Sequence, residues 1–178
     1  MSNIREELVK LLQDDPNSPV IEKLVSEVEE NHPVDLDRDS ELLHGVWDLR
    51  WSRSSQLWLR QASWLENLQI LDPVRKRGAN ILRLRGPLRA TEGVFVQADL
   101  DVINSTRVEV CFRRGGLIGP RFPGIGQVSL LRDVRQIFPA WLDMTVLDSL
   151  LRICRGNAGT TFALLKRSAT RSFEELLV

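Results

Sequence analysis

The chain has 178 residues, enough for one domain with a sizeable core, and its 24 basic and 24 acidic side chains leave no net charge. These charges are unevenly divided: residues 1–44 carry 4 basic and 12 acidic side chains, net −8, and residues 45–178 carry 20 and 12, net +8. All but two of the later cations are Arg, which forms bidentate contacts with carboxylates and phosphates. The basic body therefore has three candidate partners: anionic lipid, nucleic acid or the acidic N-terminal segment itself.

No stretch reaches the eighteen apolar residues that a membrane-spanning helix needs. The acidic N-terminus is unlike a secretory signal or an Arg-rich transit peptide, so either the chain needs no import or an import sequence has been removed. We expect a peripheral rather than a transmembrane protein. Its two cysteines form no CxxC motif, which fits reduced thiols, with one buried disulfide as the alternative.

Residues 1–32 predict a hairpin of two short helices, because apolar residues recur at helical spacing on either side of Asp14-Asp15-Pro16. Each helix has one apolar stripe and buries little alone, so we expect the hairpin to dock on the basic body or to remain loosely attached. Residues 33–44 follow as a linker that ends in a helical turn at Glu41–His44. The apolar stripes consist of Ile4, Leu8, Leu11 and Leu12, then Ile21, Leu24, Val25 and Val28.

From Gly45 the period changes to two, which predicts a strand with Gly45, Trp47, Leu49 and Trp51 on one face. Residues 54–69 mix the two periods and fit a helix face or a lid-like loop equally. The glycine-rich residues 115–126 predict a long flexible loop, since no Lys-Ser/Thr pair follows to make a phosphate loop. Further strands are predicted at residues 80–85, 94–100, 107–114, 127–131 and 134–138.

The C-terminal part predicts two strands joined by a tight turn. Residues 148–155 alternate, Arg155–Gly159 supplies turn residues, and Thr161–Leu165 returns. We expect this hairpin to close the sheet against the strand that begins at Gly45. The count of about eight strands predicts an α+β, mainly β fold: an antiparallel lipocalin-like barrel over residues 45–167, followed by a tail at 168–178.

Several motifs resemble those of the PAP/fibrillin family, the plastid lipid-associated proteins. The similar segments are Glu41-Leu42-Leu43, Gly45-Val46-Trp47, Asn80, Thr145, Leu147-Asp148, Leu151-Arg152-Ile153, Arg155-Gly156-Asn157 and Phe162–Leu165. The chain departs from the family at Met144 and Val146, where a Thr and an aromatic residue are usual. The structural signature that the resemblance implies consists of Gly45, Trp47, Asn80, Asp148, Arg152, Arg155 and Gly156.

In lipocalin-like barrels an Arg of the last strands packs over the Trp of the first strand and closes one end. Arg152 or Arg155 would do this to Trp47, at about 1–2 kcal/mol for a desolvated pair. The alternative is that both Arg side chains pair with carboxylates such as Asp148.

Nothing in the sequence predicts an enzyme, a metal site or a cofactor. His32 and His44 are the only histidines and lack partners at ligand spacing, and Cys111 and Cys154 lie inside predicted strands. A nucleic-acid partner is not expected either, because the Arg residues are scattered rather than gathered with exposed aromatics on one face.

The resemblance implies a non-enzymatic structural or carrier role at thylakoids or lipid globules, with an isoprenoid, carotenoid or acyl lipid in or at the mouth of the barrel. The location would be the cytoplasm or thylakoid surface of a photosynthetic bacterium, or a plastid. The alternative is a scaffold that binds a protein partner in prenyl-lipid metabolism and whose barrel is filled by its own side chains. The candidate lipid contacts are Trp51, Trp58, Trp64, Leu117, Ile118 and Phe122. The candidate head-group contacts are Arg75, Lys76, Arg77, Arg113 and Arg114.

Overall fold

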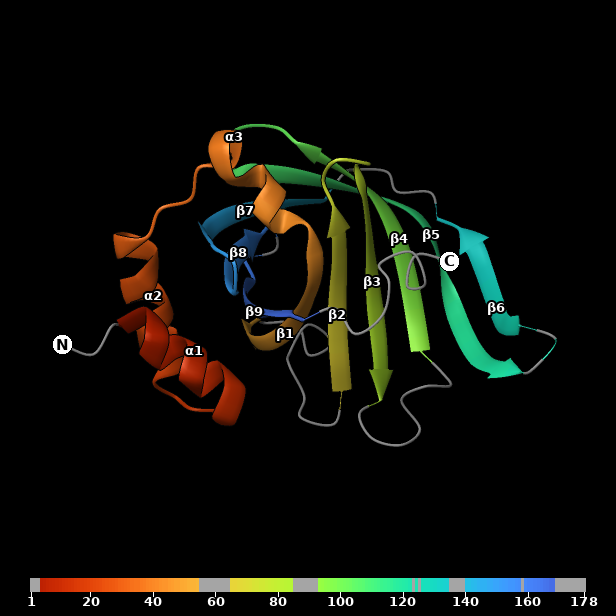
Figure 1. Cartoon of the computed structure of the whole chain (residues 1–178), viewed down its shortest axis with the longest axis horizontal. Helices are drawn as coiled ribbons and strands as arrows, with labels where there is room; N and C mark the ends of the chain where they lie inside the picture. The colour runs from red at the N-terminus through yellow and green to blue at the C-terminus, as the bar shows by residue number, and fades with distance from the viewer. Residues whose placement is uncertain are drawn as a thin grey trace.

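A computed structural model describes residues 4–54, 65–84, 93–122, 124, 126–134, 140–157 and 159–168. Within these ranges the chain forms three α-helices, one 3₁₀ helix and nine strands (Figure 1). The helices are α1 (Ile4–Asp14), α2 (Ile21–Asn31), α3 (Leu36–Asp39) and η1 (Ser40–Leu43). The strands are β1 (Gly45–Arg53), β2 (Leu65–Asp72), β3 (Arg77–Leu84), β4 (Gly93–Val102), β5 (Arg107–Phe122), β6 (Gly126–Asp133), β7 (Ala140–Leu147), β8 (Leu151–Gly156) and β9 (Thr161–Arg167).

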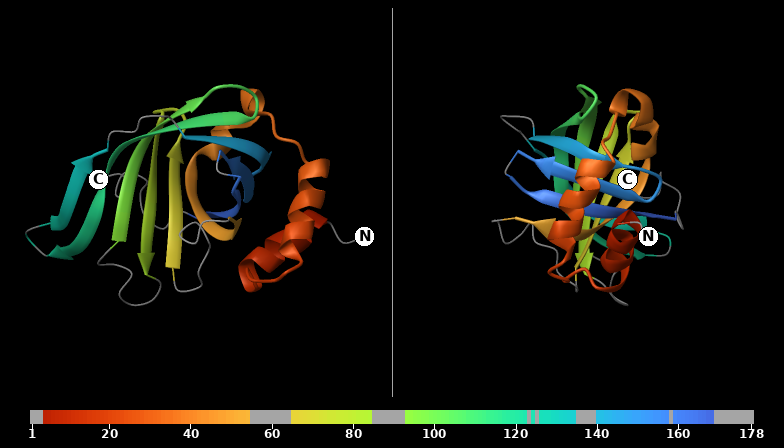
Figure 2. Two further views of the ribbon diagram at one scale, coloured as in Figure 1. Left: turned by 180° about the vertical axis from the view of Figure 1, so that it is seen from behind. Right: turned by 90° about the vertical axis from the view of Figure 1, so that its left-hand side faces the viewer.

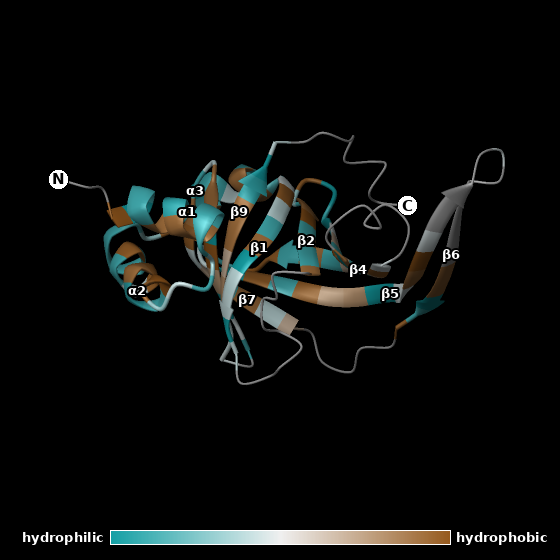
Figure 3. Ribbon diagram, turned by 90° about the horizontal axis from the view of Figure 1, so that it is seen from below, coloured by the Kyte–Doolittle hydropathy of each residue, from teal (hydrophilic) through white to brown (hydrophobic). Residues whose placement is uncertain are grey.

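All nine strands belong to one antiparallel sheet with the order β4-β3-β2-β1-β9-β8-β7-β5-β6. An additional pairing of β4 with β5 closes eight of these strands into a ring, and β6 pairs with the far part of β5 outside it. Figure 3 shows β5 and β6 running beyond the barrel, away from the helices. The predicted fold class, a mainly β barrel preceded by helices, is confirmed.

The predicted closure of the barrel is also confirmed, because β9 pairs with β1 from Val46↔Arg167 to Arg53↔Thr161. A β-bulge between Leu49 and Trp51 shifts the register of this pair. Trp47 and Leu49 therefore pack inside the barrel, whereas Trp51 packs outside it against the helices. The prediction that Trp47 and Trp51 share one face of the strand was wrong, because the alternation of side chains does not continue through a bulge.

The helical hairpin docks on the outside of the barrel, where α1 contacts β1 and β9 and α2 contacts β7 (Figure 2). Its apolar stripes join buried side chains of β7, β8 and β9 in one cluster. Ion pairs flank this cluster, from Glu22 to Arg53, from Glu29 to Arg155 and from Arg5 to Asp148. The acidic N-terminal segment is thus an internal partner of the basic body.

The number of strands was predicted closely, but some strands lie at other residues than those predicted. Leu65–Asp72 forms β2, where a helix face or lid was expected, and Ala140–Leu147 forms a further strand, β7. Residues 115–122 are not a flexible loop but continue β5. A Cβ at Gly116 would collide with the Leu130 carbonyl group, so glycine is needed there for close strand packing and not for the flexibility of a loop.

Two smaller corrections concern boundaries. Val134 lies just after β6 rather than in a strand, and residues 135–138 of that predicted strand lie outside the described residues. The linker becomes helical at Leu36, five residues before the expected turn, because Asp35 caps α3 by accepting a hydrogen bond from the Asp37 N–H.

Candidate functional site: the barrel interior

The barrel encloses a cavity of about 240 Å³. Its walls are mainly aliphatic and aromatic, and a few uncharged polar side chains interrupt them. The apolar wall includes Leu71, Leu100, Val108, Val110, Phe112 and Phe162. The polar lining consists of Asn67, Gln69, Asn80, Asn157 and Thr160. This composition is typical of sites that hold an apolar ligand and fix its orientation with a few polar contacts.

Strand register explains why these side chains meet. Trp47 on β1 pairs with Gln69 on β2, which pairs with Asn80 on β3, which in turn pairs with Val96 on β4. Directly paired residues point to the same side of a sheet, so this row follows the inner wall of the barrel. Asn80, predicted only as a signature residue, is therefore part of the cavity wall.

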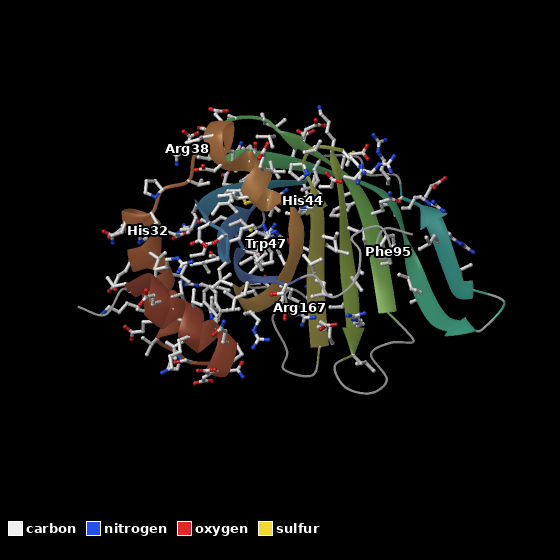
Figure 4. All side chains as sticks on the ribbon, viewed as in Figure 1. His32, Arg38, His44, Trp47, Phe95 and Arg167 are labelled. Carbon is white, nitrogen blue, oxygen red and sulfur yellow. The ribbon has the colours of Figure 1, made fainter. Side chains whose placement is uncertain are left out.

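Trp47 anchors one end of the interior and is completely buried. Its indole Nε1 donates a hydrogen bond to the Leu43 carbonyl oxygen at 2.8 Å, which ties β1 to η1. Figure 4 shows where Trp47 lies inside the barrel. The Arg152 guanidinium lies 5.0 Å from the centre of the Trp47 ring, so the predicted cation–π contact is confirmed for Arg152. Arg155 instead pairs with Glu29 on α2.

A second cation that sequence reasoning missed lies at the same ring. The Lys166 ammonium group is 5.1 Å from the centre of the Trp47 ring and donates a hydrogen bond to the Leu42 carbonyl oxygen at 2.9 Å. The sequence offered one signal, because Lys166 is one of only two Lys residues in the Arg-rich body. Its pairing with Trp47 across β1 and β9 is visible only in the structure. Burial, and then the charge of Arg152, lower the pKa of Lys166, and burial also lowers the pKa of Arg152.

Comparison with known families decides what this barrel is. The model of the PAP_fibrillin family matches residues 8–165, most of the chain. The chain belongs to the PAP/fibrillin family. Members of this family are generally plastid lipid-associated, non-catalytic structural proteins, and the family is typical of plastids and cyanobacteria. A search of curated proteins gives no match.

The remaining PAP/fibrillin signature residues hold the chain in place. The Asp148 carboxylate accepts hydrogen bonds from the Leu150 and Leu151 N–H groups at 2.7 and 2.8 Å and a bidentate pair from Arg5. Gly45 adopts a φ of 135°, and a Cβ there would collide with the Lys166 side chain. These residues stabilise turns and seams of the barrel.

The departures at Met144 and Val146 both place apolar side chains in the core. Met144 is buried on the inner side of β7 and lines the cavity, whereas Val146 is buried on the outer side against the helices. A bulge between these two residues accounts for the change of side. Met144 makes the cavity more apolar than a Thr would.

Beyond the cavity, an exposed apolar row continues the inner wall of this PAP/fibrillin barrel. Val94 pairs with Leu117 and Leu117 pairs with Leu130, and these side chains are 42, 58 and 63% exposed. Val94 is two residues along β4 from Val96, which lines the cavity, so the row and the cavity share one face of the sheet. Of the predicted lipid contacts, Leu117 lies in this row.

The other predicted lipid contacts lie elsewhere. Ile118 is half-buried on the opposite face of the sheet against the cluster that contains Phe95, and Trp51 packs on the helical hairpin. Trp58, Trp64 and the Phe122 side chain lie outside the described residues.

Four of the five predicted head-group cations pair with carboxylates of the chain itself. These ion pairs are Arg75–Asp72, Lys76–Asp101, Arg113–Asp99 and Arg114–Asp133. Hydrogen bonds to Asp101 and Asp99 raise the pKa values of Lys76 and Arg113. Arg77 is exposed at the start of β3. Asp72 is buried, but in the other three pairs both side chains are exposed, so those pairs are weak and leave their cations accessible to other anions.

Two searches of the described part of the chain were negative. It contains no group of three or more His, Cys, Asp and Glu side chains arranged to hold a metal ion. None of its helices is long and apolar enough to cross a membrane.

Proposed function

We propose that this protein is a non-catalytic lipid carrier or structural protein of photosynthetic membranes or lipid globules that holds one apolar chain in its barrel. The observation that carries the proposal is the cavity of about 240 Å³ with apolar walls inside a barrel of the PAP/fibrillin family. A barrel filled by its own side chains, as the scaffold alternative requires, would have little room for a ligand.

The volume of the cavity limits the size of the ligand. Ligand sites are commonly about 300–1,000 Å³, so this cavity of about 240 Å³ is smaller than most of them. At roughly 30 Å³ for each group the size of a water molecule, it holds about eight such groups. We therefore propose that the ligand inserts a single acyl or isoprenoid tail, and that a whole carotenoid would extend out of the barrel.

The exposed row of Val94, Leu117 and Leu130 supports contact with a lipid surface. A contiguous apolar patch on the surface of a soluble protein usually marks an interaction site. Because the row continues the cavity wall, a tail leaving a bilayer or globule would meet apolar side chains along its whole path.

The test is native mass spectrometry of the protein purified from its own host, compared with the Ala98→Phe variant. Ala98 is buried and lines the cavity, so the larger ring would fill it, whereas Val74→Phe adds the same ring on a turn where the side chain is 79% exposed. We expect a co-purifying lipid with the wild type and Val74→Phe and none with Ala98→Phe. Lipid retained equally by Ala98→Phe would contradict binding in the cavity, and no lipid with any of the three would favour the scaffold.

A further inference from the structure

Arg152 is a buried cation inside the barrel, with 0% of its area exposed. Its neighbours along β8 fix its direction: Leu151 and Ile153 pack outward on the helices, whereas Cys154 packs inward with Trp47. Arg152 therefore points inward by strand alternation, and its position over the Trp47 ring agrees. Gln69, which accepts its hydrogen bond, lines the cavity, so one residue of the cavity wall connects the guanidinium to that space; Arg152 itself does not line the cavity.

The hydrogen-bonding capacity of this guanidinium is mostly unused. Nη2 donates to Gln69 Oε1, but Nε and Nη1 have no hydrogen-bond partner among the described residues. Buried Arg side chains are normally paired with a carboxylate, because an uncompensated buried charge costs several kcal/mol. Here the one hydrogen-bonding partner is a neutral amide, and the second cation at the ring, Lys166, adds positive charge rather than cancelling it.

The site therefore combines unpaired donors and excess positive charge with an adjoining apolar cavity. We propose that Arg152 is the head-group site for the carboxylate of a fatty acid whose chain occupies the cavity, with Lys166 reinforcing the attraction. This inference rests on the proposed function, and it adds the charge and orientation of the ligand: carboxylate inward at Trp47, chain outward.

The volume of the cavity suits a chain of this kind. Space for about eight methylene-sized groups accommodates most of a ten-carbon chain. The rest of a longer chain would lie along Val94, Leu117 and Leu130, where the inner wall continues outside the barrel. A free phosphate would satisfy the donors but leave the apolar walls unfilled, which is why the amphipathic anion fits better.

The experiment measures binding of decanoic acid and decanol to the full chain by calorimetry at pH 8, with inorganic phosphate and decyl phosphate as further probes. Charge-assisted hydrogen bonds predict that decanoate binds about 10–100-fold more tightly than decanol. Arg152→Gln should abolish this preference, so that decanoate no longer binds more tightly than decanol. Arg155→Gln, a change three residues along the same strand at an exposed Arg that pairs with Glu29, should preserve it.

A second measurement does not depend on whether Arg152→Gln folds. In the wild type, the ¹⁵N resonance of Arg152 Nε should shift on addition of decanoate and not of decanol. Equal affinity for decanoate and decanol, or an unmoved Arg152 resonance, would overturn the head-group site while leaving the proposed carrier function intact. Failure of both compounds to bind would instead count against the carrier function itself. Tighter binding of decyl phosphate, or equal binding of inorganic phosphate, would overturn the choice of a carboxylate.

Discussion

The two ends of the sheet differ in whether their apolar side chains are covered. At one end, β7, β8, β9 and β1 have both faces covered, because their outer side chains pack on the helical hairpin. At the other end, β5 and β6 extend past the barrel beside the edge of β4, and the apolar row of Val94, Leu117 and Leu130 is exposed there. Apolar burial is thus concentrated where the hairpin docks, and apolar exposure where the barrel opens out.

The difference originates in β5, which at 16 residues is the longest strand. Its first part pairs with β7 from Arg107 to Val110 and closes the ring, whereas its second part pairs with β6 from Arg114 onward. The inner wall therefore continues along β5 after the opposite wall has ended. The first part of the strand contributes to the closed barrel, and the second exposes the side chains that we propose to contact a lipid surface.

The largest effect is expected when a Leu→Ala substitution at the hairpin end of the sheet is compared with one at the exposed end. Leu151→Ala removes a side chain with 0% exposure from the cluster under the hairpin and should destabilise the protein by about 2–5 kcal/mol. Leu130→Ala removes a side chain that is 63% exposed and should change stability by no more than about 0.5 kcal/mol. Urea denaturation followed by circular dichroism measures both. A cost at Leu130 close to that at Leu151 would mean that the row is covered in solution.

The second prediction concerns lipid contact. Replacing Leu117 and Leu130 together by Ser should weaken binding to liposomes of anionic plant lipids by about 2 kcal/mol, since each Leu is expected to insert only partly. Val74→Ser, at a turn side chain that is 79% exposed, is the control and should bind as the wild type does. Binding unchanged in the double variant would remove this row from the lipid contact and leave the membrane role to other surfaces.

The sequence predicted the architecture where local signals were strong. Strand alternation and the Arg155–Gly159 turn predicted the terminal hairpin, and helical spacing predicted α1 and α2. It failed where tertiary packing decides: β2 mixes periods, and Gly115 and Gly116 looked like a loop although they pack a strand.

The site was only partly predictable for the same reason. The Arg152 contact with Trp47 followed from a motif, but the missing carboxylate, the nearby Lys166 and the cavity depend on distances across the barrel. The bulge that moves Trp51 outward was likewise invisible in the alternating pattern. Cross-strand register is set by the whole sheet, so one strand's sequence does not specify it.

The third prediction tests how the hairpin end is held at low pH. Burial raises the pKa of Asp148, but hydrogen bonds from Arg5 and from the Leu151 and Leu150 N–H groups outweigh it and hold the pKa below its ordinary value. A depressed folded-state pKa stabilises the fold above the unfolded pKa, and this contribution is lost as the pH falls through the folded value.

The wild type should therefore lose stability below about pH 4, and Asp148→Asn should lose less over the same range. At pH 7 the substitution should cost about 1–2 kcal/mol, allowing for the partial exposure of the pair. Glu66 on β2 contributes in the same direction. Burial raises its pKa, but the hydrogen bond and charge of Arg83 and the charge of Arg167 outweigh burial and hold the pKa below its ordinary value. Equal pH dependence in wild type and Asp148→Asn would contradict this role of Asp148.

The smallest expected effect separates apolar from charged contributions at the hairpin. Arg155 pairs with Glu29 on α2, and its side chain is 55% exposed, so Arg155→Ala should cost no more than about 1 kcal/mol and less in high salt. The cluster that contains Leu151 would then account for most of the docking free energy, while the complementary charges select where the hairpin docks. Urea denaturation at low and high salt checks this. A cost at Arg155 as large as that at Leu151 would mean that charge, rather than apolar burial, holds the acidic helices on the basic barrel.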